Sequence, residues 1–288
     1  MTFKKLTKNP MILSGTFMIL IILLAVIFVP IFSPYKWYDL DGSLKFNPPS
    51  AQHWFGTTRI GQDLFVNICE GGRISLLLAS VAVIPYTVFG TLFGLLCGYG
   101  NKRVNFALSQ FMTFVQALPL LPLIMMMGIF LRQLNFTTLQ VLLTSVVIYS
   151  FLSTPTLFKV VRAETMRIRS EDYLLAAEVS GVSRRAILFK HLFPNLRSHV
   201  IVSSIQFMAQ ILIVELMLSF IGIGFSGTIN EAIQPTWGNL IPNISGPNAF
   251  KEYYWTWFYP IGIVAVTTIS LRLLSEGLRV AFDPKAQE

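Results

Sequence analysis

The stretch 171–195 reads EDYLLAAEVSGVSRRAILFKHLFPN and is a charged, helix-patterned island between two long apolar runs. The run before it, 133–158, has no charged residue, and the run after it, 198–230, has a single acid, Glu215. A helix that crosses a bilayer needs about 20 mainly apolar residues. Both runs are long enough, so the island is predicted to be a loop held between two membrane spans.

The whole chain has the composition of a membrane protein. Its 288 residues are 53% hydrophobic and only 12% charged, whereas soluble domains carry about 25% charged residues. Helices are expected, because in lipid each backbone amide must be hydrogen-bonded within its own segment. We therefore predict an all-α polytopic membrane protein with six transmembrane helices. Windows with little or no charge place them at about 11–32, 74–98, 106–131, 138–160, 199–224 and 256–278.

The basic residues predict an orientation. Loops on the cytoplasmic side of a membrane carry an excess of Lys and Arg. If the N-terminus is cytoplasmic, most of the 22 Lys and Arg residues fall in inner segments, so both termini are predicted to be cytoplasmic. The predicted units are an anchor helix with an extracellular surface segment (1–72), a transmembrane core (73–280) containing a cytoplasmic loop (161–198), and a cytoplasmic tail (281–288).

The first half of the island has the spacing of a short helix. Four mostly small residues share one face at i, i+3, i+4 and i+7, namely Tyr173, Ala176, Ala177 and Ser180. Small side chains let another surface approach closely. Glu171 and Asp172 stand at the start of this helix, where acids suit the positive end of the helix dipole.

A glycine separates this helix from a second one. Gly181 follows the last turn, where a left-handed cap favours glycine. Val182 comes next, and Ser183 is placed to cap a second helix. Pro194 is predicted to end that second helix near His191. The island is therefore predicted to be a rigid helix–glycine–helix unit, which we call the elbow (residues 171–195).

The elbow resembles the EAA loop of ABC importer permeases. The likeness rests on Ala176-Ala177, four residues before Gly181, and on the downstream sequence HLFPN at 191–195. In that family the first short helix of the loop, the coupling helix, fits a groove in a cytoplasmic ATPase. Leu175 stands where the family often has Glu, which weakens any salt-bridge role at that position.

Further motifs extend the resemblance along nearly the whole chain. They are HWFGTTRIGQD (53–63), GGRISL (71–76), LSFIGIG (218–224), PTWGN (235–239), and Gly277-Leu278-Arg279 with Asp283-Pro284. Together they are similar to the second permease subunit of the dipeptide, oligopeptide and nickel group (OppC/DppC-like). The resemblance implies the type I ABC importer permease fold and a multi-pass protein of the bacterial plasma (inner) membrane.

The resemblance also implies a function and partners. The chain is expected to be the permease subunit of an ATP-driven importer for di- and oligopeptides, with nickel or nickel chelates as the alternative cargo. Expected partners are a second homologous permease, two ABC ATPase subunits, an extracellular solute-binding protein and membrane lipid, with no nucleic acid. The residues expected to couple to the ATPase are Glu171, Asp172, Tyr173, Ala176, Ala177, Gly181, Val182 and Ser183.

Catalysis is not expected in this chain. It has no G-x-x-x-x-G-K-[ST] sequence, the loop that cradles ATP phosphates, so ATP and Mg are expected on the partner ATPase subunits. No cofactor or metal site is predicted here. The alternative of another class is a stand-alone channel or carrier, which would need its own selectivity elements and no ATPase-docking elbow.

Glu215 is the one acid within the fifth predicted span. A carboxylate at the centre of a bilayer costs about 2.5–3.5 kcal/mol on insertion scales. It is therefore expected to face protein or a water-filled path. Two roles remain open, a pathway or gate residue and a helix–helix hydrogen bond to a partner subunit.

Three smaller predictions concern local structure. Pro119 and Pro122 are expected to kink the third span. Arg272 and Glu276, four residues apart, are expected to pair within the last helix. Arg59 and Asp63 either pair with each other, contact the binding protein, or are surface charges without a role.

Overall fold

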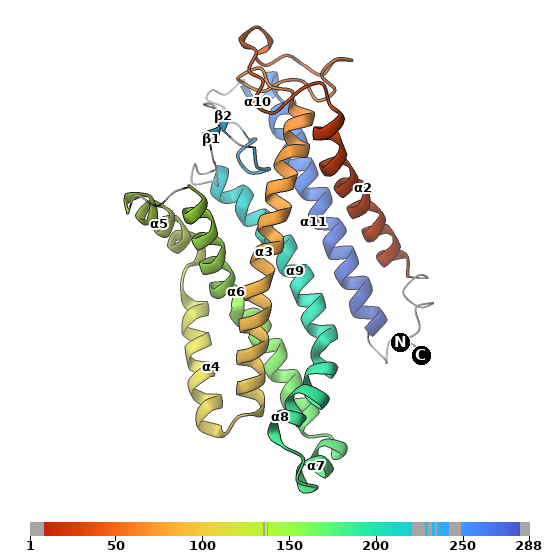
Figure 1. The fold of residues 1–288 in the computed structure, drawn as a ribbon, viewed down its shortest axis with the longest axis vertical. Coiled ribbons are helices and arrows are strands. Elements are labelled where there is room, and N and C mark those ends of the chain that lie inside the picture. Colours follow the sequence, from red (N-terminus) through yellow and green to blue (C-terminus); the bar gives the residue numbers. More distant parts are fainter. Residues whose placement is uncertain are drawn as a thin grey trace.

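The structure is a computed structural model that describes residues 9–134, 136, 138–220, 228–229, 232–233, 235–241 and 249–282. In that part of the chain, long helices form a bundle with short elements at both ends (Figure 1). Five of these helices are long and apolar enough to cross a membrane, and a sharply bent pair makes six if it is counted as one span. The predicted all-α membrane fold is therefore confirmed.

Several helices are longer than the spans predicted for them. In order they are α2 (Pro10–Phe32), the 3₁₀ turn η1 (Gly42–Leu44), α3 (Leu64–Tyr99), α4 (Lys102–Ala117), α5 (Leu120–Gln133), α6 (Thr138–Arg169), α7 (Asp172–Val179), α8 (Arg184–Ala186), the π turn η2 (Ile187–Leu192), α9 (Phe193–Phe220), β1 (Thr228–Ile229), β2 (Ala232–Ile233), α10 (Ala249–Glu252) and α11 (Trp255–Phe282). The two short strands pair antiparallel, with Thr228 opposite Ile233.

Helices α2 and α11 pack side by side through glycines (Figure 1). A Cβ atom on Gly15 would lie 2.8 Å from the backbone nitrogen of Leu274, and one on Gly277 would lie 2.6 Å from the side chain of Ile12. The side chain of Asn9 donates a hydrogen bond to the carbonyl of Gly277 at 3.3 Å. The start of the first helix therefore lies against the end of the last one.

Helices α3 and α6 approach even more extensively along a row of glycines. The three glycines recur every four residues, the small-xxx-small spacing that lets membrane helices meet closely. A Cβ atom on any of them would lie within 2.6–2.7 Å of a side-chain atom on α6. The contacting pairs are Gly90 with Leu157, Gly94 with Val161, and Gly98 with Thr165.

The third span is broken rather than gently kinked. Helices α4 and α5 meet at 77°, with Leu118 and Pro119 between them. Leu118 is extended, with φ −68° and ψ 132°, the conformation that a following proline imposes. Pro122 lies in the first turn of α5, where a missing N–H costs nothing. The predicted bend at the prolines is confirmed, and it is sharper than a kink.

The segment before α3 folds over one end of the helix bundle. Asp63 caps α3, because its Oδ1 accepts from the backbone N–H of Val66 at 2.8 Å. Its Oδ2 lies 2.9 Å from Nδ1 of buried His53. The ring of Phe55 stacks on that of Tyr259 in α11, with centroids 4.0 Å apart. Helix α3 therefore begins at Leu64, ten residues before the predicted start of its span at 74. It begins there because Asp63 is the residue that caps it.

The structure shows neither a pair between Arg59 and Asp63, one of three alternatives left open, nor the predicted pair between Arg272 and Glu276. Asp63 pairs with His53 instead of Arg59, because residues 58–62 form a turn, not a helix, and leave Arg59 exposed at its tip. Glu276 pairs with Arg279 at 2.6 Å, three residues on rather than four residues back. Both spacings lie on one helix face, so the sequence alone does not choose between them.

Candidate functional site

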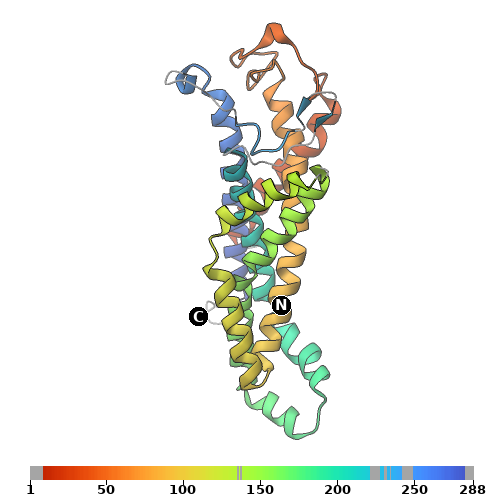
Figure 2. The ribbon, with the colours of Figure 1, turned by 90° about the vertical axis from the view of Figure 1, so that its left-hand side faces the viewer.

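The elbow lies at the end of the bundle opposite η1 (Figures 1 and 2). Helix α6 continues to Arg169, nine residues beyond the predicted end of its span at 160. Helix α7 then projects past the neighbouring ends of α3 and α4, and the chain returns through α8 and η2 into α9. The elbow is therefore continuous with two long helices of the bundle.

The predicted glycine break is confirmed. Gly181 has a φ of +76°, in the left-handed region that disfavours residues with a Cβ atom. The N–H of Val182 donates to the carbonyl of Ala177 at 3.1 Å, the bond that closes a Schellman cap. Ser183 accepts from the N–H of Ala186 at 3.3 Å and so caps α8. A Cβ atom on Gly181 would meet nothing within 4 Å, so the glycine is needed for its backbone conformation.

The prediction that Pro194 ends the second helix is wrong. The chain stays helical from Arg184 through η2 into α9. In η2 the N–H of Phe193 bonds to the carbonyl of Leu188, five residues back. This wider turn accommodates the proline ring, which in a regular helix clashes with the carbonyl four residues earlier. The side chain of Asn195 also donates to the carbonyl of His191 at 2.7 Å.

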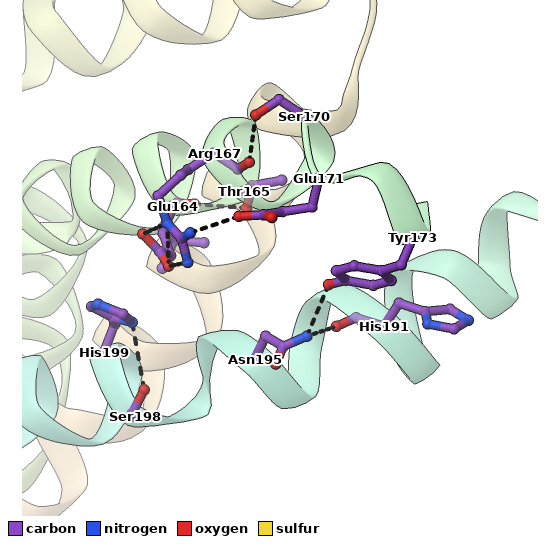
Figure 3. A network of polar contacts seen from close by, with 11 residues as sticks. Glu164, Thr165, Arg167, Ser170, Glu171, Tyr173, His191, Asn195, Ser198 and His199 are labelled. Atoms are coloured by element: carbon purple, nitrogen blue, oxygen red, sulfur yellow. Dashed lines mark hydrogen bonds and ion pairs between the residues drawn. The ribbon is translucent and has the colours of Figure 1, made fainter. Parts of the chain in front are cut away.

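Polar contacts tie the base of α7 to both neighbouring helices (Figure 3). Arg167 on α6 contacts Glu164 at 2.6 Å and Glu171 at 3.0 Å. On the other side, the amide of Asn195 donates to the hydroxyl of Tyr173 at 3.3 Å. Tyr173 therefore takes part in a contact between α7 and the start of α9, whereas the sequence analysis placed it on a docking face. The sequence does show Asn195, the last residue of the HLFPN motif, but it does not show that Tyr173 is its partner.

The rest of α7 is an exposed and largely apolar surface. Leu174 is fully buried against the bundle, whereas Leu175 is 47% exposed and Val179 is 90% exposed. Asp172 and Ala176 are exposed on the same face, at i, i+3, i+4 and i+7. We call this set (Asp172, Leu175, Ala176 and Val179) the α7 face. Among the other predicted coupling residues, Glu171, Val182 and Ser183 are exposed and Ala177 is partly buried.

The α7 face lies beside the face predicted from sequence and shares Ala176 with it. Tyr173 and Ser180 of the predicted face are exposed as well, so its docking role stays a prediction. The burial of Leu174 directs Leu175 and Val179 outward. Leu175 and Val179 thus place two exposed aliphatic side chains next to each other on an otherwise polar loop. The position that lacks the family's glutamate, Leu175, contributes an apolar side chain to this face.

Glu215 lies in a buried polar junction far from the elbow. It is 4% exposed, and the hydroxyl of Ser75 on α3 donates to its Oε1 at 3.0 Å. The side chain of Thr236 and the backbone of Gly238 lie beside the carboxylate. The N–H of Trp237 donates to the Ser75 hydroxyl at 3.0 Å. The hydrogen bond that the structure shows joins α9 to α3 within this chain, so the pathway role and a bond to a partner subunit both stay predictions.

Trp237 completes this junction. Its side chain is fully buried and its indole N–H donates to the carbonyl of Ile68 at 2.9 Å. Gly71 and Gly72 leave the space that it occupies, since a Cβ atom on Gly72 would lie 3.0 Å from the indole ring. The motifs at 71–76 and 235–239 thus pack on each other. Residues 221–224, Asp283 and Pro284, which belong to the other quoted motifs, lie outside the described residues.

Comparisons with known proteins match nearly the whole chain. Residues 90–288 match the family model of the binding-protein-dependent transport system inner membrane component, and residues 1–49 match that of the N-terminal TM domain of oligopeptide transport permease C. A putative peptide permease protein of Brucella suis is 29% identical over 280 residues, which is 97% of this chain and 89% of the relative.

Two further relatives are named for oligopeptides. The oligopeptide transport system permease protein OppC of Bacillus subtilis is 26% identical over 281 residues, 98% of this chain and 88% of that protein. The protein of the same name from Escherichia coli is 28% identical over 284 residues, 98% of this chain and 89% of that protein.

Proposed function

Because this chain belongs to the family of binding-protein-dependent transport system inner membrane components, we propose that it is the subunit through which an ATP-driven importer moves di- and oligopeptides into the cell. It is a multi-pass inner membrane protein and an ABC importer permease, as are the relatives that it matches over nearly its full length. The names of those relatives support peptides as cargo over nickel or nickel chelates.

We further propose that the α7 face docks into a cytoplasmic ATPase subunit. The observation that carries this proposal is the 90% exposure of Val179 on a helix whose base is held by Arg167 and Tyr173. The base of this helix is fixed to the bundle, and its α7 face is exposed. The complete machine would contain a second homologous permease, two ABC ATPase subunits that bind ATP and Mg, and an extracellular solute-binding protein.

The elbow is built to pass movement into the membrane. Arg167 ties α7 to α6, and the uninterrupted helical path from Arg184 joins the elbow to α9. A displacement of α7 by a closing ATPase pair would therefore move two spans together as rigid bodies. Coupling in this scheme depends on the angle between α7 and α8, which Gly181 sets through its left-handed backbone.

Two substitutions at Gly181 test this scheme. Gly181→Val should reduce peptide uptake by about five- to thirtyfold, because a β-branched residue is strained by roughly 1–2 kcal/mol in the left-handed region. Gly181→Asn should retain most of the uptake, because Asn tolerates that region. The assay is uptake of a labelled tripeptide and of Ni²⁺ by vesicles containing the complete complex, with ATP hydrolysis measured alongside.

The outcomes separate the two parts of the proposal. Full uptake by Gly181→Val, at wild-type levels of membrane insertion, would contradict the coupling role. Uptake of Ni²⁺ without uptake of the tripeptide by the unmodified complex would contradict the cargo and leave the coupling role standing.

A further inference from the structure

A cleft lined by cationic side chains lies where α3, α4 and α6 meet. Its volume is about 460 Å³. The polar lining comes from Lys102 and Asn105 at the start of α4 and from Arg162 and Arg169 near the end of α6. Neither the elbow nor the Glu215 junction uses these side chains.

The two arginines are held in place by the protein. Arg162 donates to the side-chain oxygen of Asn105 at 2.8 Å, and its Nε has no hydrogen-bond acceptor. Arg169 donates to the carbonyl of Tyr99 at 3.3 Å and lies 5.1 Å from the centroid of that ring. Both guanidinium groups are therefore positioned before any ligand arrives, and part of their donor capacity is unused.

The positive charge of the cleft is not balanced by nearby acids. Across the described ranges of the chain, none of Lys102, Arg162 and Arg169 forms an ion pair with a carboxylate. The acids nearest in sequence, Glu164 and Glu171, are both engaged by Arg167. The positive end of the α4 dipole opens at the same place. An anion would thus meet three cations without displacing an existing partner.

The cleft has both charged and apolar borders, and it lies near the predicted ends of membrane spans, where lipid headgroups are found. The residues that line the cleft lie close to three predicted span boundaries. Two spans end at residues 98 and 160, and a third begins at 106. The side chains of Phe106 and Met166, which are 67% and 45% exposed, form its apolar border. Basic pockets between spans at the inner face are sites where anionic lipid headgroups bind.

We propose that this cleft binds the phosphate headgroup of an anionic phospholipid, with the acyl chains lying along Phe106 and Met166. Lys102, Arg162 and Arg169 contact the phosphate oxygens, and charge-assisted hydrogen bonds from arginine favour this geometry. The proposal is independent of the cargo and of docking at the α7 face. A free phosphate anion shares the headgroup chemistry but not the acyl chains.

Native mass spectrometry of the full-length chain in detergent tests the proposal. The chain is titrated with phosphatidylglycerol, with phosphatidylcholine and with inorganic phosphate. Phosphatidylglycerol should bind more tightly than phosphatidylcholine, and inorganic phosphate at the same concentration should not displace it. Removing a cation should weaken phosphatidylglycerol binding by about fivefold, the effect of one basic residue near a lipid surface.

The variants separate a site from general surface charge. Arg162→Gln with Arg169→Gln should weaken binding by about 25-fold. The matched control, Arg103→Gln with Arg197→Gln, removes the same charge from exposed positions outside the cleft and should leave binding unchanged. Lys102→Gln removes only an exposed side chain, so it tests the cleft even if the arginine variant fails to fold.

Three results would overturn the proposal. They are equal binding of the two lipids, equal loss in the cleft and control variants, and displacement of phosphatidylglycerol by equimolar inorganic phosphate. The last result would assign the cleft to a free anion.

Discussion

Glu215 shows how one buried carboxylate can organise distant parts of a chain. It lies in α9, yet it accepts a hydrogen bond from Ser75 on α3 and lies beside Thr236 and Gly238. The cost of burying this group is offset because each partner brings a donor to it. Its position in a span therefore reflects the need to hold a loop between two helices.

Substitutions at Glu215 should separate shape from hydrogen bonding. Glu215→Leu leaves the groups around Ser75 and Thr236 without an acceptor, at a cost of about 1–3 kcal/mol for each unpaired group. Glu215→Gln keeps a side-chain oxygen and should lose much less. Thermal unfolding of the purified chain measures the difference. Equal destabilisation by the two variants would show that the charge, and not the acceptor, is what the junction needs.

At the level of elements, the contact between α3 and α6 depends on small side chains. Gly94 faces Val161 with no space for a Cβ atom, whereas a Cβ atom on Gly262 in α11 would meet nothing within 4 Å. The two glycines thus differ in their surroundings while sharing a helical backbone, which makes them a matched pair for experiment.

Gly94→Ala should destabilise the chain and Gly262→Ala should not. The added methyl group on α3 forces the helices apart, an overpacking cost of about 1–3 kcal/mol. The same change on α11 improves helix propensity by roughly 0.5–1 kcal/mol. Unfolding of both variants in detergent gives the comparison. If the two variants unfold alike, close packing at Gly94 does not hold α3 against α6.

The sequence predicted those elements whose cause is local. The break at Pro119 and the left-handed turn at Gly181 follow from the residues that occupy them. The exposure of Leu175 and Val179 was not predicted, because the depth of Leu174 depends on the rest of the bundle. The contact of Trp237 with Gly72 and the bond from Asn195 to Tyr173 were not predicted, since each joins residues far apart in the chain.

For the whole molecule, the arrangement of its two ends implies an orientation that can be tested. The α7 face is proposed to lie in the cytoplasm, and the segment around Trp54, which is 65% exposed, outside the cell. The start of α2 lies against the end of α11, where Asn9 bonds to Gly277. This end of the bundle is proposed to face the cytoplasm.

Single cysteines should report this orientation. Val179→Cys should react with a membrane-impermeant maleimide only in inverted vesicles and should cross-link to an ATPase subunit in the complete complex. Trp54→Cys should react from the outside of intact spheroplasts. The native Cys69 and Cys97 are buried and give the background. Labelling of Val179→Cys from the outside would reverse the topology and exclude docking at the α7 face.

The wide turn at Ile187–Leu192 has a consequence for how such chains can diverge. It holds one residue more than a regular helical turn, and each residue rotates a helix by about 100°. Removing that residue would turn α8 relative to α9 and bring the ring of Pro194 against the carbonyl of Lys190. Because α7 is also held to α6, the side of α7 offered to a partner depends on both long helices that flank the elbow.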